Sequence, residues 1–144
     1  MSDGDTITVL DDSRQPYKVR LAGIDAPEKK QPFGERSKQA LAAMVFGRDV
    51  RIEWQKQDRY RRIVGQVWVE RSDPDCGHRP CPQALDVSLA QVAAGLAWHY
   101  RKYMREQSSA DRLRYGAMEE TARTKQLGLW ADPQAVPPWD WRKR

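Results

Sequence analysis

The stretch from Tyr17 to Glu28 most constrains how this chain can fold and what it can bind. Its first half alternates apolar and basic residues, which predicts a β-strand with one buried face. The strand breaks at Gly23 into a loop that carries Asp25 and Glu28, three residues apart. Pro27 stiffens this loop, because its ring fixes φ and biases the preceding residue toward an extended conformation. Two interpretations remain open: a site where acids and a basic strand residue hold a metal ion and a phosphate, or a plain strand exit with solvated charges.

The composition favours a single globular domain over residues 1–144. Hydrophobic residues make up 40% of the chain and charged residues 31%, as in a soluble folded protein rather than a disordered one. No apolar run approaches the roughly 18 residues of a membrane span, so we expect no membrane partner. The net charge of +5 favours a polyanion such as nucleic acid, although basic clusters more often only face solvent. We expect the domain to act as a monomer.

Hydrophobic patterning predicts an α+β fold. Alternating residues predict strands at 6–10, 17–22, 50–54 and 63–70, the first two forming a hairpin. Helical spacing predicts three α-helices, at 35–46, 86–94 and 108–126, each ending at or near a glycine. Gly65 inside a strand indicates a β-bulge or a close backbone approach. The Pro/Trp tail at 131–144 should be extended and polyproline-like. A five-stranded OB-fold β-barrel with three α-helices fits this pattern.

A polar excursion at residues 71–84 contains both cysteines, Cys76 and Cys81, with His78 between them. A disulfide closing this short loop is the favoured interpretation and would contribute roughly 2 kcal/mol in the entropy model. Free thiols and a three-ligand zinc site remain alternatives. A disulfide would imply an oxidising compartment, and hence a secreted or periplasmic protein whose leader has been removed. The first residues show no signal peptide, so a cytoplasmic location is the alternative.

Three acids and two arginines lie near the ends of predicted strands. The acids Asp5, Asp25 and Glu28 offer the hard oxygen ligands that Ca²⁺ and Mg²⁺ prefer. Arg20 and Arg62 offer guanidinium forks that match phosphate, each charge-assisted hydrogen bond being worth about 1.5–3 kcal/mol. The alternative is a set of turn acids and rim ion pairs, worth about 0–1 kcal/mol each on a surface.

Three tyrosines lie among basic residues, as groups that stack on nucleic-acid bases would: Tyr60, Tyr100 and Tyr103. His78 and His99 have dissimilar sequence surroundings, and the sequence has no glycine-rich phosphate loop, HExxH pair or serine elbow. The sequence therefore disfavours a histidine-based nuclease and predicts that His99 serves packing.

Five motifs in order resemble the staphylococcal nuclease (thermonuclease) family, from Asp3 to about Trp130. They are Asp3-Gly4-Asp5-Thr6, the stretch from Val19 to Glu28, Asp58-Arg59-Tyr60-Arg61-Arg62, Gly95-Leu96-Ala97-Trp98 and Gly128-Leu129-Trp130. The resemblance implies an OB-fold and calcium-dependent hydrolysis of phosphodiesters. Two positions depart from the family's usual residues, because Ala26 stands where Thr is common and Arg61 where Gly is common.

Carried over residue by residue, the resemblance implies a calcium site in the loop after the second strand. The carboxylates of Asp5 and Asp25 and the backbone carbonyl of Ala26 would bind the ion. Glu28 would position or deprotonate the attacking water.

The resemblance also implies a substrate site made of arginines and aromatic residues. Arg20 and Arg62 would hold the scissile phosphate, and Tyr60 would line the nucleotide site. The extra cation at Arg61 would strengthen binding of a polyanion or crowd the loop.

We therefore predict a Ca²⁺-dependent, sequence-nonspecific nuclease that hydrolyses DNA and RNA by in-line attack of water. The alternative is a non-catalytic OB-fold module that binds nucleic acid or another partner. Degenerate copies of the family that take this route typically lose the acids and arginines, which this chain retains.

Overall fold

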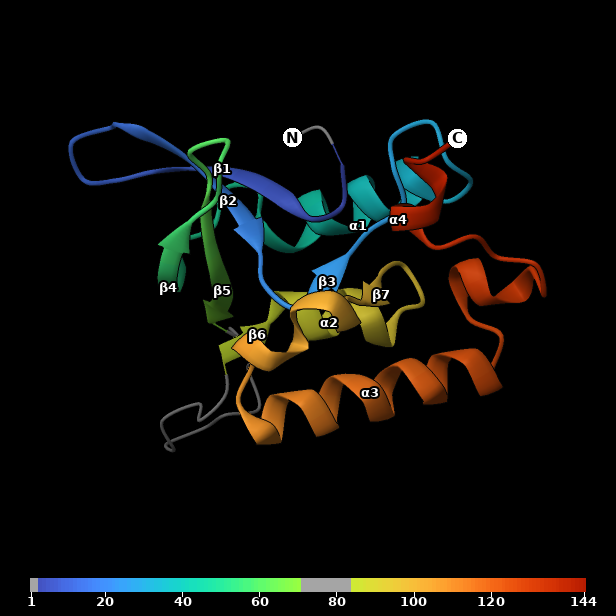
Figure 1. The fold of residues 1–144 in the computed structure, drawn as a ribbon. Coiled ribbons are helices and arrows are strands. Elements are labelled where there is room, and N and C mark those ends of the chain that lie inside the picture. Colours follow the sequence, from blue (N-terminus) through green and yellow to red (C-terminus); the bar gives the residue numbers. More distant parts are fainter. Residues whose placement is uncertain (1–2, 71–83) are drawn as a thin grey trace, which may run out of the picture.

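A computed structural model describes residues 3–70 and 84–144, and it divides the strands between two sheets (Figure 1). The five-stranded sheet contains β1 (Thr6–Leu10), β2 (Pro16–Leu21), β4 (Val50–Gln57), β5 (Ile63–Glu70) and β6 (Ala84–Asp86). Its order is β1-β2-β5-β4, with β6 paired to β5. The β2–β5 pair is parallel and the other pairs are antiparallel, so the sheet is mixed. A smaller sheet pairs β3 (Ile24–Asp25) with β7 (Trp98–His99).

The three predicted α-helices are present, and their ends follow local sequence signals. They are α1 (Gly34–Val45), α2 (Val87–Ala93) and α3 (Ser109–Thr124). Ser108 caps α3, since its side chain accepts a hydrogen bond from the Asp111 N–H. Asp86 caps α2 in the same way, through the Leu89 N–H. Among the described residues there are also two 3₁₀ helices, η2 (Arg101–Glu106) and η3 (Gly128–Ala131), and a short α4 (Pro138–Trp141). Figure 1 shows α3 running beneath α2 and the smaller sheet.

The predicted α+β class is confirmed, but the strands do not close into a barrel. Within the described residues, β1 and β4 lie at the two ends of the strand order and each pairs with a single strand. The predicted close approach at Gly65 is confirmed, because a Cβ there would lie 2.9 Å from Ile52 Cγ2 and 3.0 Å from the Glu53 carbonyl oxygen. The facing strand shifts register between Trp54 and Lys56, as at a bulge.

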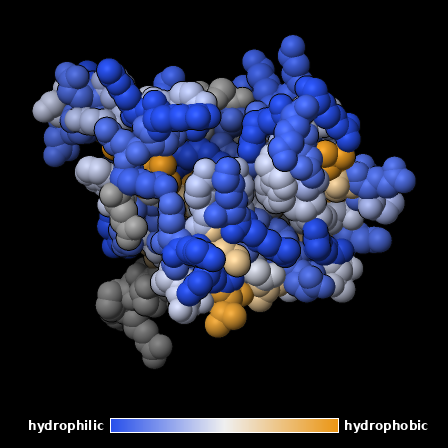
Figure 2. Space-filling model, viewed as in Figure 1, coloured by the Kyte–Doolittle hydropathy of each residue, from blue (hydrophilic) through white to orange (hydrophobic). Residues whose placement is uncertain are grey.

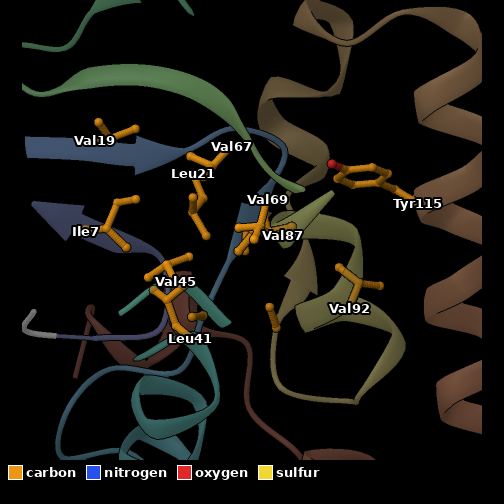
Figure 3. Close-up of a cluster of buried hydrophobic side chains, with 13 residues drawn as sticks. Ile7, Val19, Leu21, Leu41, Val45, Val67, Val69, Val87, Val92 and Tyr115 are labelled. Carbon is orange, nitrogen blue, oxygen red and sulfur yellow. The ribbon is translucent and has the colours of Figure 1, made fainter. Parts of the chain in front are cut away.

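The main core lies between the sheet and the first two α-helices (Figure 3). Alternate residues of β1, β2 and β5 point into it, together with one face of α1 and α2. Its buried members include Ile7, Val19, Leu21, Leu41, Val45, Val67, Val69, Val87 and Val92. Burying each such side chain contributes about 1.5–3 kcal/mol. Tyr115 of α3 reaches the same cluster and donates a hydrogen bond to Asp86 Oδ2 at 2.7 Å. This packing fixes the end of β2, and therefore the loop that follows it.

The prediction of an extended tail is wrong for residues 138–141, which form α4. Pro137 is extended, with φ −60° and ψ 146°, but Pro138 occupies the first turn, where its fixed φ suits a helix. Trp139 then packs edge-on against Trp98, with ring centroids 5.5 Å apart. The helical turn thus places a half-buried tryptophan against the cluster around Trp98, and this packing is not visible in the local sequence.

Several predictions concern residues outside the described part of the chain. They are residues 71–83 of the excursion predicted at 71–84, among them Cys76, His78 and Cys81; Ala84, its last residue, begins β6. In the described part, no helix combines the length and the apolar character that crossing a membrane requires. Hydrophilic side chains cover most of the face seen in Figure 2.

Candidate active site

Two buried acids and one arginine form the centre of the site. The side chains of Asp5, just before β1, and Asp25, in β3, are 5% and 1% exposed. Arg20 of β2 lies between them, with its Nη2 atom 3.6 Å from both Asp5 Oδ2 and Asp25 Oδ1. Asp5 is tied to the loop, because its Oδ2 accepts a hydrogen bond from the Ala26 N–H at 2.9 Å. The structure thus brings together Asp5, Arg20, Asp25 and Ala26, as the sequence predicts.

The backbone of the loop holds Arg20 in place. Its Nη1 donates to the carbonyl oxygens of Leu21 and Ile24, both at 2.9 Å. The turn that lets one guanidinium reach both carbonyls passes through Gly23, which has φ 84°. A side chain at that position would be strained, and its Cβ would lie 2.5 Å from Gln107 Nε2. Arg20 is therefore preorganised by residues within a short stretch of sequence.

Arg62 enters the site from the turn between β4 and β5. Its Nε donates to Asp58 Oδ2 at 2.7 Å, and Asp58 Oδ1 accepts from the backbone N–H groups of Tyr60 and Arg62 at 2.8 and 3.0 Å. Burial opposes ionisation of Asp58, but these hydrogen bonds and the charge of Arg62 lower its pKa. Asp58 was missed as a site residue, although an aspartate that opens a turn four residues before an arginine is a recognisable signal.

A short hydrogen-bonded chain links Arg62 to the first acid. The Arg62 Nη1 atom donates to Thr6 Oγ1 at 3.4 Å, and that hydroxyl donates to Asp5 Oδ1 at 3.2 Å. Burial opposes ionisation of Asp5, yet the charge of Arg20 and the hydrogen bonds from Asp3, the Ala26 N–H and Thr6 lower the pKa of the carboxyl. Asp3 lies at the rim, and burial together with the charge of Asp5 raises its pKa to about 7.

A hollow of about 750 Å³ contains most of the predicted site residues. Its walls include Asp5, Arg20, Asp25, Glu28, Tyr60, Arg62, Tyr100 and Tyr103. Basic side chains surround the aromatic ones: Lys56 and Lys102 lie 5.3 and 5.4 Å from the centre of the Tyr103 ring. The combination of exposed rings and cations suits bases and phosphates of a single strand.

Two predicted site residues, Ala26 and Arg61, do not line this hollow. The φ of Arg61, 62°, lies in the left-handed region that favours glycine. This conformation explains why the resembling family commonly has Gly at that position. His99 is buried, and its Nε2 lies 2.7 Å from Gln107 Oε1, so the prediction that it serves packing is confirmed.

The C-terminal segment supplies a third arginine, which sequence reasoning missed. Arg142, just after α4, places Nη1 3.1 Å from Asp25 Oδ1 and Nη2 2.7 Å from Asp25 Oδ2. The same Nη1 lies 2.6 Å from Glu28 Oε1. Hydrogen bonds to these two acids raise the pKa of Arg142. Burial raises the pKa of Asp25, although Arg142 and Arg20 oppose that shift. No local signal predicts these contacts, since more than a hundred residues separate the partners.

The donor chemistry of the hollow suits a hard divalent cation. Asp5 and Asp25 are buried carboxylates that face arginines, so the fold has placed negative charge where a cation must balance it. Within residues 3–70 and 84–144, no three His, Cys, Asp or Glu side chains converge on one point. Backbone carbonyls and waters would therefore have to complete any coordination.

The fold and this hollow define a class of small α+β proteins whose site combines buried acids with phosphate-binding arginines. The family described as "Staphylococcal nuclease homologue" matches residues 18–132, and the chain belongs to that family. The domain of this family is an OB-fold, which agrees with the predicted fold class apart from the open sheet. The matched range contains Arg20, Asp25, Glu28 and Arg62, while Asp5 and Arg142 lie outside it.

Curated relatives extend over nearly the whole chain. The chain is 50% identical to "Protein ParB" of Escherichia coli over 98% of its own length and 75% of that protein's. It is 42% identical to "Micrococcal nuclease" of Shigella flexneri, over 98% of the chain and 76% of the relative. An "Uncharacterized endonuclease" of Escherichia coli is 38% identical, over 99% and 80%. The two relatives whose names include a nuclease, together with the family match, support a nuclease function.

Proposed function

We propose that this protein is a calcium-dependent nuclease that hydrolyses DNA and RNA phosphodiester bonds without base specificity. One observation carries the proposal: Arg20 lies 3.6 Å from both Asp5 and Asp25, in the hollow that Glu28 and Arg62 also line. Two acids, a general base and two phosphate-binding cations are the groups that metal-assisted hydrolysis of a phosphodiester needs. The nuclease names among the relatives support the same reaction class.

The carboxylates of Asp5 and Asp25 and the carbonyl of Ala26 would hold the calcium ion. When bound, the ion supplies positive charge to a phosphoryl oxygen of the substrate. The buried position of both acids keeps their oxygens in a region of low dielectric, where such a charge interacts strongly.

The remaining residues bind the substrate and move one proton. Arg20 and Arg62 hold the scissile phosphate and stabilise the negative charge that grows on its oxygens. Glu28 accepts a proton as water forms a bond to phosphorus. The bond from phosphorus to the leaving oxygen breaks, and that oxygen takes a proton from solvent. The exposed rings of Tyr60 and Tyr103 stack on bases, and stacking tolerates any base because each has a π-face. One face of the Tyr100 ring, the third proposed stacking group, is covered by Trp139.

Plasmid DNA and an RNA of mixed sequence, incubated with calcium or with excess chelator, test this function. We expect cleavage of both substrates with calcium and none with chelator. Glu28→Gln should lower kcat by about 10²–10⁴-fold, the usual contribution of a general base. Glu35→Gln is the matched control, because Glu35 is an exposed acid in the first turn of α1. Calcium-independent binding without cleavage would contradict the proposal and support the non-catalytic module.

A further inference from the structure

Arg142 is bound to two of the three acids that the proposed reaction would use, Asp25 and Glu28. Its guanidinium forms a two-pronged contact with Asp25 at 2.7 and 3.1 Å and a third contact with Glu28 at 2.6 Å. Asp25 has therefore both carboxylate oxygens engaged, and Glu28 shares its Oε1 with the same group. A divalent cation that takes Asp25 as a ligand therefore competes with Arg142 for the same two oxygens.

The two partners of the Arg142–Asp25 ion pair differ in solvent exposure. The side chain of Asp25 is 1% exposed, whereas that of Arg142 is 41% exposed. When Arg142 leaves, only Arg20, 3.6 Å from Asp25, compensates this buried charge, so replacement of Arg142 by another cation is favoured. Asp25 therefore requires a cation nearby, while Arg142 can return to solvent at little cost. This asymmetry makes the arginine the exchangeable partner.

The C-terminal segment, residues 136–144, keeps Arg142 close to the hollow. Trp139 stacks on Tyr100 with ring centroids 5.4 Å apart and an angle of 7° between the planes. The Gln31 side chain also donates to the Val136 carbonyl oxygen at 2.6 Å. In Figure 1 α4 returns beside the loop that follows β3. This tethering gives Arg142 a high effective concentration at Asp25.

The segment nevertheless has little structure of its own. The α4 helix contains four residues, far fewer than an isolated helix needs in water. Its order depends on the aromatic packing and on the contacts of Arg142, so removing those contacts weakens docking of the whole segment.

We propose that the C-terminal segment is an autoinhibitory element in which Arg142 competes with calcium for Asp25 and covers Glu28. The inference rests on the proposed calcium-dependent function and adds regulation of the same site. Calcium entry releases Arg142 from both acids, so one event fills the metal site and frees the general base. By linkage, docking of the segment and calcium binding weaken one another by the same factor.

Calcium titration by calorimetry on three forms of the full chain tests the competition. The forms are the wild type, Arg142→Gln and Lys143→Gln, which removes one positive charge from an exposed neighbouring position. We expect Arg142→Gln to bind calcium about tenfold more tightly than the wild type. The change in binding free energy behind this factor lies between that of an exposed ion pair and that of a charge-assisted hydrogen bond. The calcium affinity of Lys143→Gln should stay within about twofold of the wild type, because this change alters only the screened, long-range electrostatic potential at the site.

Hydrogen–deuterium exchange in residues 136–144 provides a second readout that does not depend on activity. Calcium should speed exchange in this segment of the wild type and of Lys143→Gln. In Arg142→Gln, exchange should already be faster without calcium and should change little on its addition. Equal protection with and without calcium in the wild type would overturn the inference.

The outcomes separate this inference from the proposed function. If the wild type binds calcium and Arg142→Gln binds it no more tightly than Lys143→Gln does, the autoinhibition is wrong and the calcium site stands. If none of the three forms binds calcium, the proposed calcium dependence fails, and the competition fails with it. A loss of kcat in Arg142→Gln at saturating calcium would also overturn the inference, because Arg142 would then serve the reaction directly.

Discussion

Arg20 and Arg142 contact the same carboxylate, Asp25, but they come from regions of very different construction. Arg20 lies five residues before Asp25 in the chain, is 15% exposed, and is fixed by two carbonyl oxygens of the intervening loop. Arg142 lies 117 residues after Asp25, is 41% exposed, and is held through side-chain contacts. Arg20 is therefore a fixed part of the site, whereas Arg142 is an exposed group that binds to it.

Replacing Arg20 should produce the largest effect. We expect Arg20→Ala to lower kcat by roughly 10³-fold or more, as removal of a phosphate-stabilising arginine does in other phosphoryl transfers. The same change leaves Asp5 and Asp25 without their shared cation, so the protein should also lose stability. Hydrolysis of single-stranded DNA and the midpoint of thermal unfolding measure the two effects.

Arg20→Lys separates the catalytic loss from the structural one. Lysine keeps the positive charge near both acids but lacks the planar fork that reaches two carbonyls and a phosphate. It should therefore recover most of the stability and little of the activity. Wild-type turnover in a folded Arg20→Lys protein would contradict the role given to Arg20.

Loosening the C-terminal segment at Trp139 should have an effect of intermediate size, and it should strengthen calcium binding rather than weaken function. Trp139→Ala removes the stack on Tyr100 and the contact with Trp98, which are worth about 0.5–1.5 kcal/mol beyond their buried area. If docking delivers Arg142 to Asp25, calcium affinity should rise severalfold, approaching that of Arg142→Gln. Trp54→Ala is the control, because Trp54 is 57% exposed and lies in β4. Unchanged calcium binding in Trp139→Ala would show that this tryptophan does not control the arginine.

The contrast between these regions also explains what the sequence could predict. Arg20, Asp25 and the Gly23 turn lie within one short stretch, so alternation and turn chemistry were enough to place them together. Asp58 also carried a local signal, which was not recognised. Arg142 carried none, because its position depends on Trp139 packing against residues about forty positions earlier. Closure of the sheet is likewise a property of non-local strand pairing, and the strand pattern alone did not show that β1 and β4 stay unpaired with each other.

Replacing Arg61 should have the smallest effect, and it tests a backbone conformation that the turn before β5 determines locally. Its φ of 62° strains a residue with a Cβ, so Arg61→Gly should stabilise the fold by about 1 kcal/mol. The matched change Arg59→Gly should destabilise it, because Arg59 is not among the residues with positive φ and glycine there only adds freedom to the unfolded chain. Thermal unfolding of the two variants gives the sign directly. A KM for DNA that rises in Arg61→Gly would mean that this arginine reaches the substrate from outside the hollow, as the sequence predicts. An unchanged KM together with higher stability would mean that the position is shaped by backbone conformation alone.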